Sequence, residues 1–340
     1  MRRSIRFITA ALICLTGTFT MGQNNCENSL YEGNKLFEAG KFQECVDLLE
    51  PCLQSKKGKE EMIESYHLLA QAYQNIGNLE KANLYVKKML SLNHDYQKYP
   101  NIDPKDFNRL VNQYSVSPKF YLGLKFGFNR NSVALKKSFS TYASSQSYLP
   151  KTGYQLGLTG DYRLKPLFSI NADLMASGVS INHIVDNAGG WKQNYTEQQN
   201  YFSLLLNGQK HFKVGSKFSV YAGLGIGFNY LYSTNVFFEA TNNETKTLQQ
   251  STQNPIDARN RFQTCANGLL GTTIPLPQGS LSIEANFGYY FGTTVNPDKR
   301  MSDSDFIFNN QYINDDVSLR MMMVNVCYKI PVVWDIRLNK

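Results

Sequence analysis

One stretch of the chain, residues 217–232, alternates strictly between two kinds of side chain. Its sequence is KFSVYAGLGIGFNYLY, in which the even positions are apolar and the odd positions are mostly small or polar. A period of two predicts an extended strand with one apolar face. The stretch is longer than the about five or six residues of a typical soluble strand, and it exceeds the about 9–11 residues that a tilted strand needs to cross a bilayer. Aromatic residues at both ends of the apolar face are typical of membrane-spanning strands. We therefore expect one strand of a closed barrel in an outer membrane.

Seven further segments after Pro118 alternate in the same way. They lie at residues 120–129, 154–163, 168–174, 202–209, 262–274, 281–291 and 322–330. The connections alternate between short links at 164–167, 212–217 and 275–280 and long polar links at 131–151, 182–199, 233–261 and 293–315. Bacterial outer-membrane barrels pair tight periplasmic turns with long outer loops in this order. The pattern predicts an eight-stranded antiparallel up-and-down β-barrel with both of its chain ends in the periplasm.

Bulk composition agrees with a barrel that is exported from the cytoplasm. Hydrophobic residues make up 42% of the chain, and the mean hydropathy of -0.37 argues against a helical membrane protein, because barrels hide their apolar residues in alternation. Residues 1–22 are typical of a signal peptide, with three arginines ahead of a short apolar run. Removing Arg2, Arg3 and Arg6 lowers the formal charge from +8 to +5, an excess that suits lipid head groups better than nucleic acid.

Charged residues also fall on the inward parity of the predicted strands. An eight-stranded barrel is about wide enough for side chains to fill its interior, and buried charges persist only when they are paired. We expect salt bridges that plug the barrel, and a narrow ion path or a buried acid/base pair is the alternative. The expected network consists of Lys125, Asp161, Arg163, Asp173, Glu284 and Lys329.

Between residues 28 and 96 the apolar period changes to that of helices. Two sets of small and apolar residues superimpose at an offset of 37 residues: Gly33/Ala70, Leu36/Tyr73, Gly40/Gly77, Phe42/Leu79, Cys45/Ala82, Leu49/Val86 and Cys52/Met89. This pattern resembles tandem tetratricopeptide repeats, whose usual period is about 34 residues. A third helix at residues 103–114 is expected as an end cap, with Asp103 as its N-cap and Pro104 at its first position. Residues 115–118 are expected to break that helix before the barrel begins.

The resemblance implies a surface that binds a partner protein. Tetratricopeptide repeats usually bind extended protein segments along the inner face of their first helices. Carried over to this chain, that face would consist of Glu27, Leu30, Asn34, Phe37, Glu64, His67, Gln71 and Gln74. The alternative is that these residues form an ordinary solvated helix face. We do not expect His67 to hold a metal, because no second His or Cys recurs at ligand spacing around it.

Cysteine pairing stays open at this point. The chain has six cysteines, of which Cys14 leaves with the signal peptide, so at least one of the remaining five is unpaired. Cys26 and Cys52 could form a disulfide or remain buried thiols. Cys45 falls on a helix face where it can serve as a small core residue.

The expected fold is therefore α+β and multidomain. We expect a signal peptide at 1–22, a periplasmic helical domain at 23–117, an outer-membrane barrel at 118–331 and a periplasmic C-terminal tail at 332–340. Over residues 119–330 the barrel resembles the small outer-membrane barrels of the PorT-like and OmpA-like type. Together the two resemblances imply an outer-membrane-anchored interaction module. It would be an accessory subunit of a secretion, assembly or envelope complex that docks a periplasmic or outer-membrane protein partner.

Two other functions are weighed against this one. A surface adhesin or receptor would act through the outer loops, with residues 233–260 as the contact, since they are rich in Asn, Thr and Gln. A lipid-modifying enzyme or protease would need a site such as His183 with Asp186 and Ser180, and a solvated loop histidine is the preferred interpretation. We expect no enzymatic activity, cofactor, metal, small-molecule substrate or nucleic-acid partner.

Overall fold

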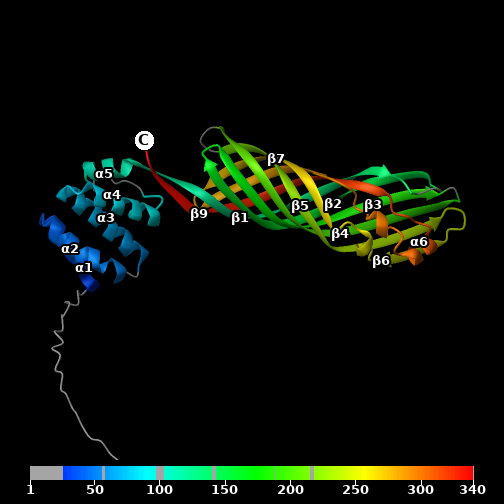
Figure 1. Ribbon diagram of the computed structural model, residues 1–340, viewed down its shortest axis with the longest axis horizontal. Helices are drawn as coiled ribbons and strands as arrows, with labels where there is room; N and C mark the ends of the chain where they lie inside the picture. The colour runs from blue at the N-terminus through cyan, green and yellow to red at the C-terminus, as the bar shows by residue number, and fades with distance from the viewer. Residues whose placement is uncertain are drawn as a thin grey trace, which may run out of the picture. The chain divides into compact units, whose positions relative to one another are not determined.

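The computed structural model describes residues 26–55, 58–96, 103–139, 143–187, 189–214 and 218–339. The chain divides into a helical unit, Met1–Val116 with Ile336–Lys340, and a β unit, Ser117–Asp335. Both units can be followed in Figure 1. The expected signal peptide at 1–22 lies outside the described residues. No helix in the described ranges has the length and the apolar character needed to cross a membrane.

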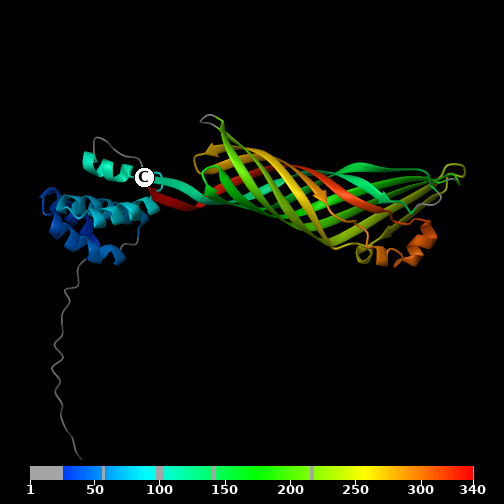
Figure 2. The same ribbon diagram turned by 45° about the horizontal axis from the view of Figure 1, so that its top comes forward.

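Two helical hairpins and a single helix make up the helical unit. The helices are α1 Ser29–Glu38, α2 Phe42–Cys52, α3 Lys59–Ile76, α4 Leu79–Leu92 and α5 Lys105–Asn112 (Figure 2). Short 3-10 turns precede α1 at Cys26–Asn28 and follow α2 at Leu53–Ser55. Gly40 and Gly77 end α1 and α3 with φ angles of 74° and 86°, a left-handed conformation that favours glycine. The two hairpins therefore turn at positions that the repeated pattern places 37 residues apart.

The core of the helical unit lies between the hairpins. Gly33 on α1 approaches α2 so closely that a Cβ atom there would lie 3.0 Å from Leu49. A disulfide joins Cys26 to Cys52, while Cys45 is a free, buried thiol. Burial raises the pKa of the Cys45 thiol to about 11, so it stays protonated. The pairing that the sequence left open is thus between Cys26 and Cys52.

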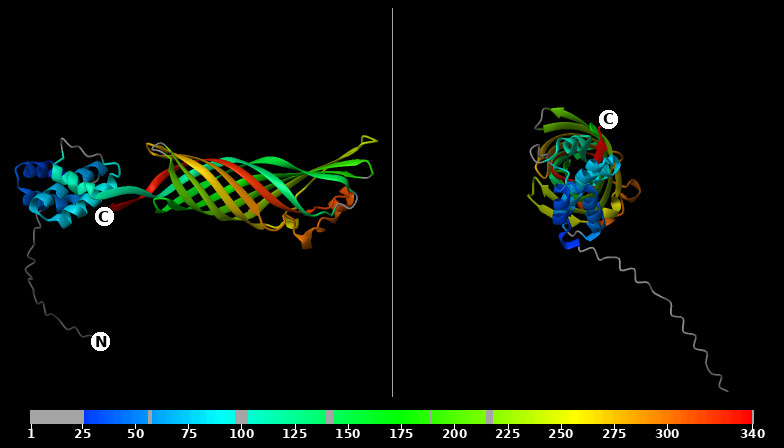
Figure 3. Two further views of the ribbon diagram at one scale, coloured as in Figure 1. Left: turned by 90° about the horizontal axis from the view of Figure 1, so that it is seen from above. Right: turned by 90° about the vertical axis from the view of Figure 1, so that its left-hand side faces the viewer.

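The described part of the β unit has nine strands, eight of which form a closed ring. They are β1 Tyr114–Lys137, β2 Ala143–Lys165, β3 Phe168–Asn187, β4 Trp191–Val214, β5 Phe218–Asn242, β6 Leu248–Gln253, which lies outside the ring, β7 Phe262–Leu276, β8 Gly279–Tyr290 and β9 Asp316–Leu338. The hydrogen-bonded order is β4-β3-β2-β1-β9-β8-β7-β5, and a β4–β5 pairing closes it (Figure 3). The short strand β6 pairs with one end of β5. The eight-stranded barrel that the alternation predicts is present.

At one end of the barrel the strands are longer than predicted. The helix α6 (Ser304–Asn310) lies at this end, which we call the α6 end (Figure 1). We call the opposite end the turn end. Residues 131–151 and 182–199, expected as loops, are largely strand, and residues 233–261 contain the rest of β5 and β6. The loop prediction was wrong there because polar residues occupy both faces of these extensions, so the apolar alternation disappears while the hydrogen-bonded ladder continues. Residues 293–315 remain a long connection, which holds a 3-10 turn at Pro297–Lys299 and α6.

The two boundary segments also differ from expectation. The strand β1 begins at Tyr114 without the break expected at 115–118, and β9 continues through most of the expected tail at 332–340. Ile336 packs against the helical core, and the backbone N–H of Asn339 donates to the Gln113 carbonyl at 2.6 Å. The C-terminal residues are therefore part of the helical unit.

Apolar side chains cover the outside of the barrel wall. Leu224 is 79% exposed and lies between Gly208 and Gly268 of the neighbouring strands. In the next outward rows Ile226 of β5 pairs with Leu206 of β4, and Phe228 pairs with Leu204. Aromatic pairs border this apolar belt. Phe128 pairs with Tyr154 toward the α6 end, and Phe120 pairs with Tyr162 toward the turn end.

Candidate functional site

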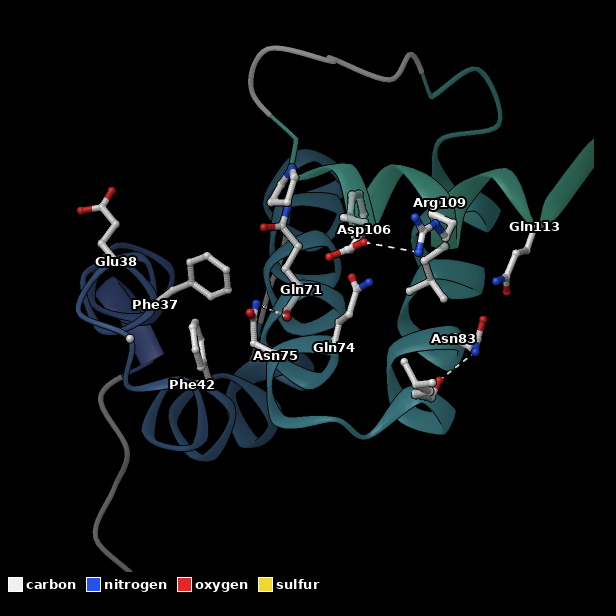
Figure 4. Close-up of a pocket in the computed structure, with 15 residues that line it drawn as sticks. Phe37, Glu38, Phe42, Gln71, Gln74, Asn75, Asn83, Asp106, Arg109 and Gln113 are labelled. Carbon is white, nitrogen blue, oxygen red and sulfur yellow. Dashed lines mark hydrogen bonds and ion pairs between the residues drawn. The ribbon is translucent and has the colours of Figure 1, made fainter.

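A groove of about 800 Å³ opens on the helical unit (Figure 4). It lies where the ends of the two hairpins meet α5, and Phe37 and Phe42 form one apolar part of its lining (Figure 4). The rings of Phe37 and Phe42 meet edge to face with their centroids 5.2 Å apart. Gly40 lines the groove as well, and the left-handed turn that it makes carries the chain from α1 to α2.

The opposite side of the groove is polar and rich in amides. Gln71 and Gln74 come from α3 and Gln113 follows α5 (Figure 4). Asn83 on α4 is held in place, since its Nδ2 donates to the Leu79 carbonyl at 2.8 Å and its Oδ1 accepts from the Tyr114 hydroxyl at 2.9 Å. Its remaining lone pairs, together with the Gln74 and Gln113 amides, can meet the N–H and C=O groups of an extended peptide.

The groove contains only part of the predicted partner-binding face. Phe37, Gln71 and Gln74 line it. Asn34 and Glu64 are exposed elsewhere on α1 and α3. Glu27 belongs to the 3-10 turn ahead of α1, and Leu30 packs against the helical core.

His67, the remaining predicted residue, contacts Asp103 and Phe107 at the start of α5. Its Nε2 is 3.0 Å from Asp103 Oδ1, and its ring meets the edge of Phe107 at 4.7 Å. Burial lowers the pKa of His67, although the Asp103 carboxylate opposes this effect. His67 therefore helps to position α5, and its side chain remains 29% exposed.

Asp103 was expected to cap α5, and that prediction was wrong. The helix has Pro104 at its N-cap position with no side-chain cap bond. Asp103 instead accepts a 2.7 Å hydrogen bond from the Tyr96 hydroxyl at Oδ2, in addition to its contact with His67. Its carboxylate is thus used to hold α5 against α3.

Sequence reasoning missed the contribution of α5 to the groove. Asp106, Arg109, Leu110 and Gln113 all line it. The Asp106 and Arg109 side chains form an exposed ion pair at 3.7 Å. The third helix was treated only as a cap, yet it occupies the position of the first helix in a further repeat, and that position could have suggested its role.

All six predicted interior charges lie together inside the barrel. Lys125 Nζ contacts Asp173 Oδ2 at 2.7 Å and Glu284 Oε2 at 2.5 Å. Lys329 Nζ lies 3.5 Å from Asp161 Oδ2 and 3.8 Å from Glu284 Oε1. The sixth member, Arg163, places Nε 3.6 Å from Asp161 Oδ1. Three cations balance three carboxylates, so the network has no formal charge left over for a permeating ion.

A second buried ion pair lies nearer the α6 end. Arg259 forms a two-pronged contact with Glu197, with Nε to Oε1 at 2.7 Å and Nη2 to Oε2 at 2.6 Å. The hydroxyls of Tyr195 and Thr234 donate to the same carboxylate at 2.9 Å each. Sequence reasoning missed this pair because it assigned both of its segments to outer loops.

Aromatic rings fill the interior at the α6 end. Tyr312 stacks on Tyr195 with ring centroids 4.5 Å apart. His183 Nδ1 lies 2.8 Å from the Tyr312 hydroxyl, and its ring stacks on Tyr148 at 4.0 Å. The interpretation of His183 as a solvated loop residue was wrong, because it is a fully buried residue of β3.

His183 does not form a catalytic group with its predicted neighbours. On β3 the odd positions 181, 183 and 185 are buried, and Ser180 and Asp186 occupy even, more exposed positions. Alternate residues of a strand point to opposite faces. Within the described ranges there is also no cluster of three or more His, Cys, Asp or Glu residues that could hold a metal ion.

Comparisons with known proteins give structural likenesses alone. No protein-family profile matches the chain, and no curated protein sequence matches it either. Neisserial surface protein A has a TM-score of 0.33 at 10% identity, over 64% of this chain and 99% of its own. The outer membrane protein OprG from Pseudomonas aeruginosa has a TM-score of 0.32 at 14% identity, over 63% and 97%. A major outer membrane protein from Thermus thermophilus has a TM-score of 0.30 at 15% identity, over 61% and 99%.

Proposed function

We propose that this chain is a non-enzymatic outer-membrane protein whose barrel anchors a periplasmic helical unit, and that the helical unit docks a partner protein. The main support for the membrane placement is the distribution of apolar and charged residues in the barrel, which is the reverse of that in a water-soluble protein. Its outer wall is apolar, while its interior holds the network of Lys125, Asp173 and Glu284. A water-soluble barrel would place these two kinds of residue the other way round.

The height of the apolar belt supports the same placement. On β1 the outward positions run from Phe120 to Phe128, which is nine residues, and a tilted strand needs about 9–11 to cross a bilayer. Aromatic residues border the belt on both sides. Toward the α6 end Phe202 pairs with Tyr230, which pairs with Phe262, as interfacial girdles require.

The barrel acts as an anchor in this proposal. Its interior is crossed by paired charges and then by aromatic rings, with Tyr312 packed between Tyr195 and Phe238 at the α6 end. Eight-stranded barrels have room for little more than their own side chains. A pore or a transport path is therefore disfavoured.

The groove is the proposed docking site. Phe37 and Phe42 offer a surface for one apolar side chain of a partner, while Gln74, Asn83 and Gln113 offer hydrogen bonds to its backbone. The two matching hairpins support the resemblance to tetratricopeptide repeats, a family that binds extended peptides. The partner would be a subunit of a secretion, assembly or envelope complex in which this chain is an accessory component.

Site-specific crosslinking in cells tests the docking. A photoreactive amino acid at Gln74 or Gln113 should yield one and the same protein adduct. The same group at Gln43, an exposed residue of α2 that does not line the groove, should yield none of that adduct. Equal adducts at all three positions, or no adduct at Gln74 and Gln113, would contradict the proposal.

A surface adhesin or receptor is the second candidate. It is favoured by the barrel extension beyond the belt and by Phe308 on α6, which is 84% exposed. If this function is the correct one, Phe308→Ser should reduce surface binding while the crosslinks at Gln74 are unaffected. An enzymatic role has the least support, because His183, Ser180 and Asp186 do not converge.

A further inference from the structure

A second groove, of about 480 Å³, lies on the outward wall of the β unit near the α6 end. Three neighbouring segments form it: β4, the extension of β5, and β6 with the residue after it. Register places Thr196 of β4 opposite Phe237 of β5, and Phe237 opposite Thr252 of β6. In the next row Gln198 lies opposite Asn235. The remaining lining residues are Val236, Gln253 and Asn254.

The chemistry of this groove is neutral and polar around one aromatic ring. Its lining has no charged residue, and Phe237 is 43% exposed. Within the described ranges the side chains of Gln198, Asn235 and Thr252 make no hydrogen bond to the protein. They therefore present unused amide and hydroxyl groups on either side of the ring.

Neutral saccharides match this arrangement. A sugar presents hydroxyl groups that both donate and accept, as do the amides and hydroxyls of the groove. The C–H face of a sugar ring carries partial positive charge, which the negative face of an aromatic ring attracts. A protein partner fits less well, because protein interfaces concentrate several aromatic residues, Met and Arg at a buried centre. An anionic ligand would find no cation.

The position of the groove indicates the source of the saccharide. Asn235 follows Tyr230, an aromatic of the belt border, by five residues along β5. At about 3.3 Å per residue, the groove lies less than about 20 Å beyond the belt and opens sideways from the wall. A membrane glycolipid in the adjacent leaflet would carry its sugar chain at this height.

We propose that the groove around Phe237 binds the neutral saccharide chain of a glycolipid in the surrounding outer leaflet. This inference rests on the proposed outer-membrane placement for the source of the saccharide, while the recognition itself depends only on the groove. Bound in this way, the barrel would be fixed laterally to the sugar layer of its own membrane.

Titration of purified full-length protein in detergent micelles tests the recognition. The probe is the neutral fraction of the delipidated saccharide that mild acid releases from the outer-leaflet glycolipid of the expressing cells, and saturation-transfer NMR reads its binding. A neutral maltooligosaccharide and a polysulfated saccharide serve as comparison probes. We expect the membrane oligosaccharide to bind, and we expect Phe237→Ala to weaken it by about 10-fold, which corresponds to about 1.4 kcal/mol. Asn235→Ala should also weaken it.

The control variant is Leu149→Ala, which removes an exposed apolar side chain of β2 outside the groove and should leave binding unchanged. Heat-modifiable migration on gels shows that each variant retains its barrel. Absence of binding, or binding that Phe237→Ala leaves intact, would overturn the proposal. Binding of the maltooligosaccharide alone would overturn the membrane source and assign the groove to an external glycan. Cell fractionation tests the outer-membrane placement separately, so the two failures can be told apart.

Discussion

Lys125→Met should be strongly destabilising, because it removes the central cation of the interior network. Lys125 Nζ contacts Asp173 and Glu284, and the side chains of all three residues are buried. Breaking a buried ion pair by removing one partner costs about 3–5 kcal/mol, since an uncompensated charge is left behind. Lys136→Met, on an exposed part of the same strand, is the matched control and should change stability by less than about 0.5 kcal/mol.

The structure also predicts which of the two carboxylates loses more stabilisation when Lys125 is replaced. Glu284 keeps a hydrogen bond from the Tyr221 hydroxyl at 2.6 Å and a contact with Lys329 at 3.8 Å. Within the described part of the chain Asp173 forms an ion pair with Lys125 alone, and its Oδ1 has no hydrogen-bond partner. Neutralising Asp173 in the double variant Lys125→Met/Asp173→Asn should therefore restore more stability than neutralising Glu284 in Lys125→Met/Glu284→Gln.

Urea unfolding of the reconstituted protein measures these differences, with heat-modifiable migration on gels and tryptophan fluorescence as independent readouts. We expect the order wild type, Lys125→Met/Asp173→Asn, Lys125→Met/Glu284→Gln, Lys125→Met, from most to least stable. If Lys125→Met unfolds within about 0.5 kcal/mol of the wild type, the buried network does not stabilise the barrel. Equal recovery in both double variants would refute the assignment of Asp173 as the dependent partner.

Three further predictions concern the helical unit, and the circular dichroism of its helices reports on each. Cys52→Ser opens a disulfide whose cysteines are 26 residues apart and should cost about 3.5 kcal/mol; equal melting of the oxidised and reduced wild type would contradict this. Because burial lowers the pKa of His67 below its ordinary value of 6.5, the unfolded chain takes up a proton first on acidification. The contribution of His67 to the free energy of unfolding should be fully present above about pH 6.5 and decline below it. His67→Gln should make that decline less steep. Gly77→Ala places a side chain at a φ of 86° and should cost about 1 kcal/mol, whereas Gly77→Asn should cost less because Asn tolerates this conformation.

The apolar strands were predictable because every second residue faces outward. Phe120 to Phe128 and Phe218 to Tyr232 alternate over the whole belt, and the same alternation places Lys125 and Glu284 on the inward parity. The glycine turns were equally visible, since Gly40 and Gly77 recur at the same place in each hairpin. In both cases a local pattern is sufficient to indicate the structure.

Beyond the belt the pattern no longer distinguishes a strand from a loop. Gln198 and Asn235 face outward and Glu197 faces inward, so both faces are polar and the alternation vanishes. The pairing of Glu197 with Arg259 could not be read from the chain, because the two residues lie 62 positions apart. The role of α5 was hidden for a similar reason, since the contact between His67 and Asp103 that positions it also joins distant residues.

Fluorescence quenching by brominated lipid tests the membrane placement of the belt most directly. Tryptophan would be introduced at Leu124, in the middle of the belt, or at Thr196, beyond it, in a background where Trp191 and Trp334 are replaced by Phe. In reconstituted vesicles brominated acyl chains should quench Leu124→Trp strongly and leave Thr196→Trp nearly unquenched. Equal quenching at both positions, or a protein that stays out of the vesicles, would contradict the account.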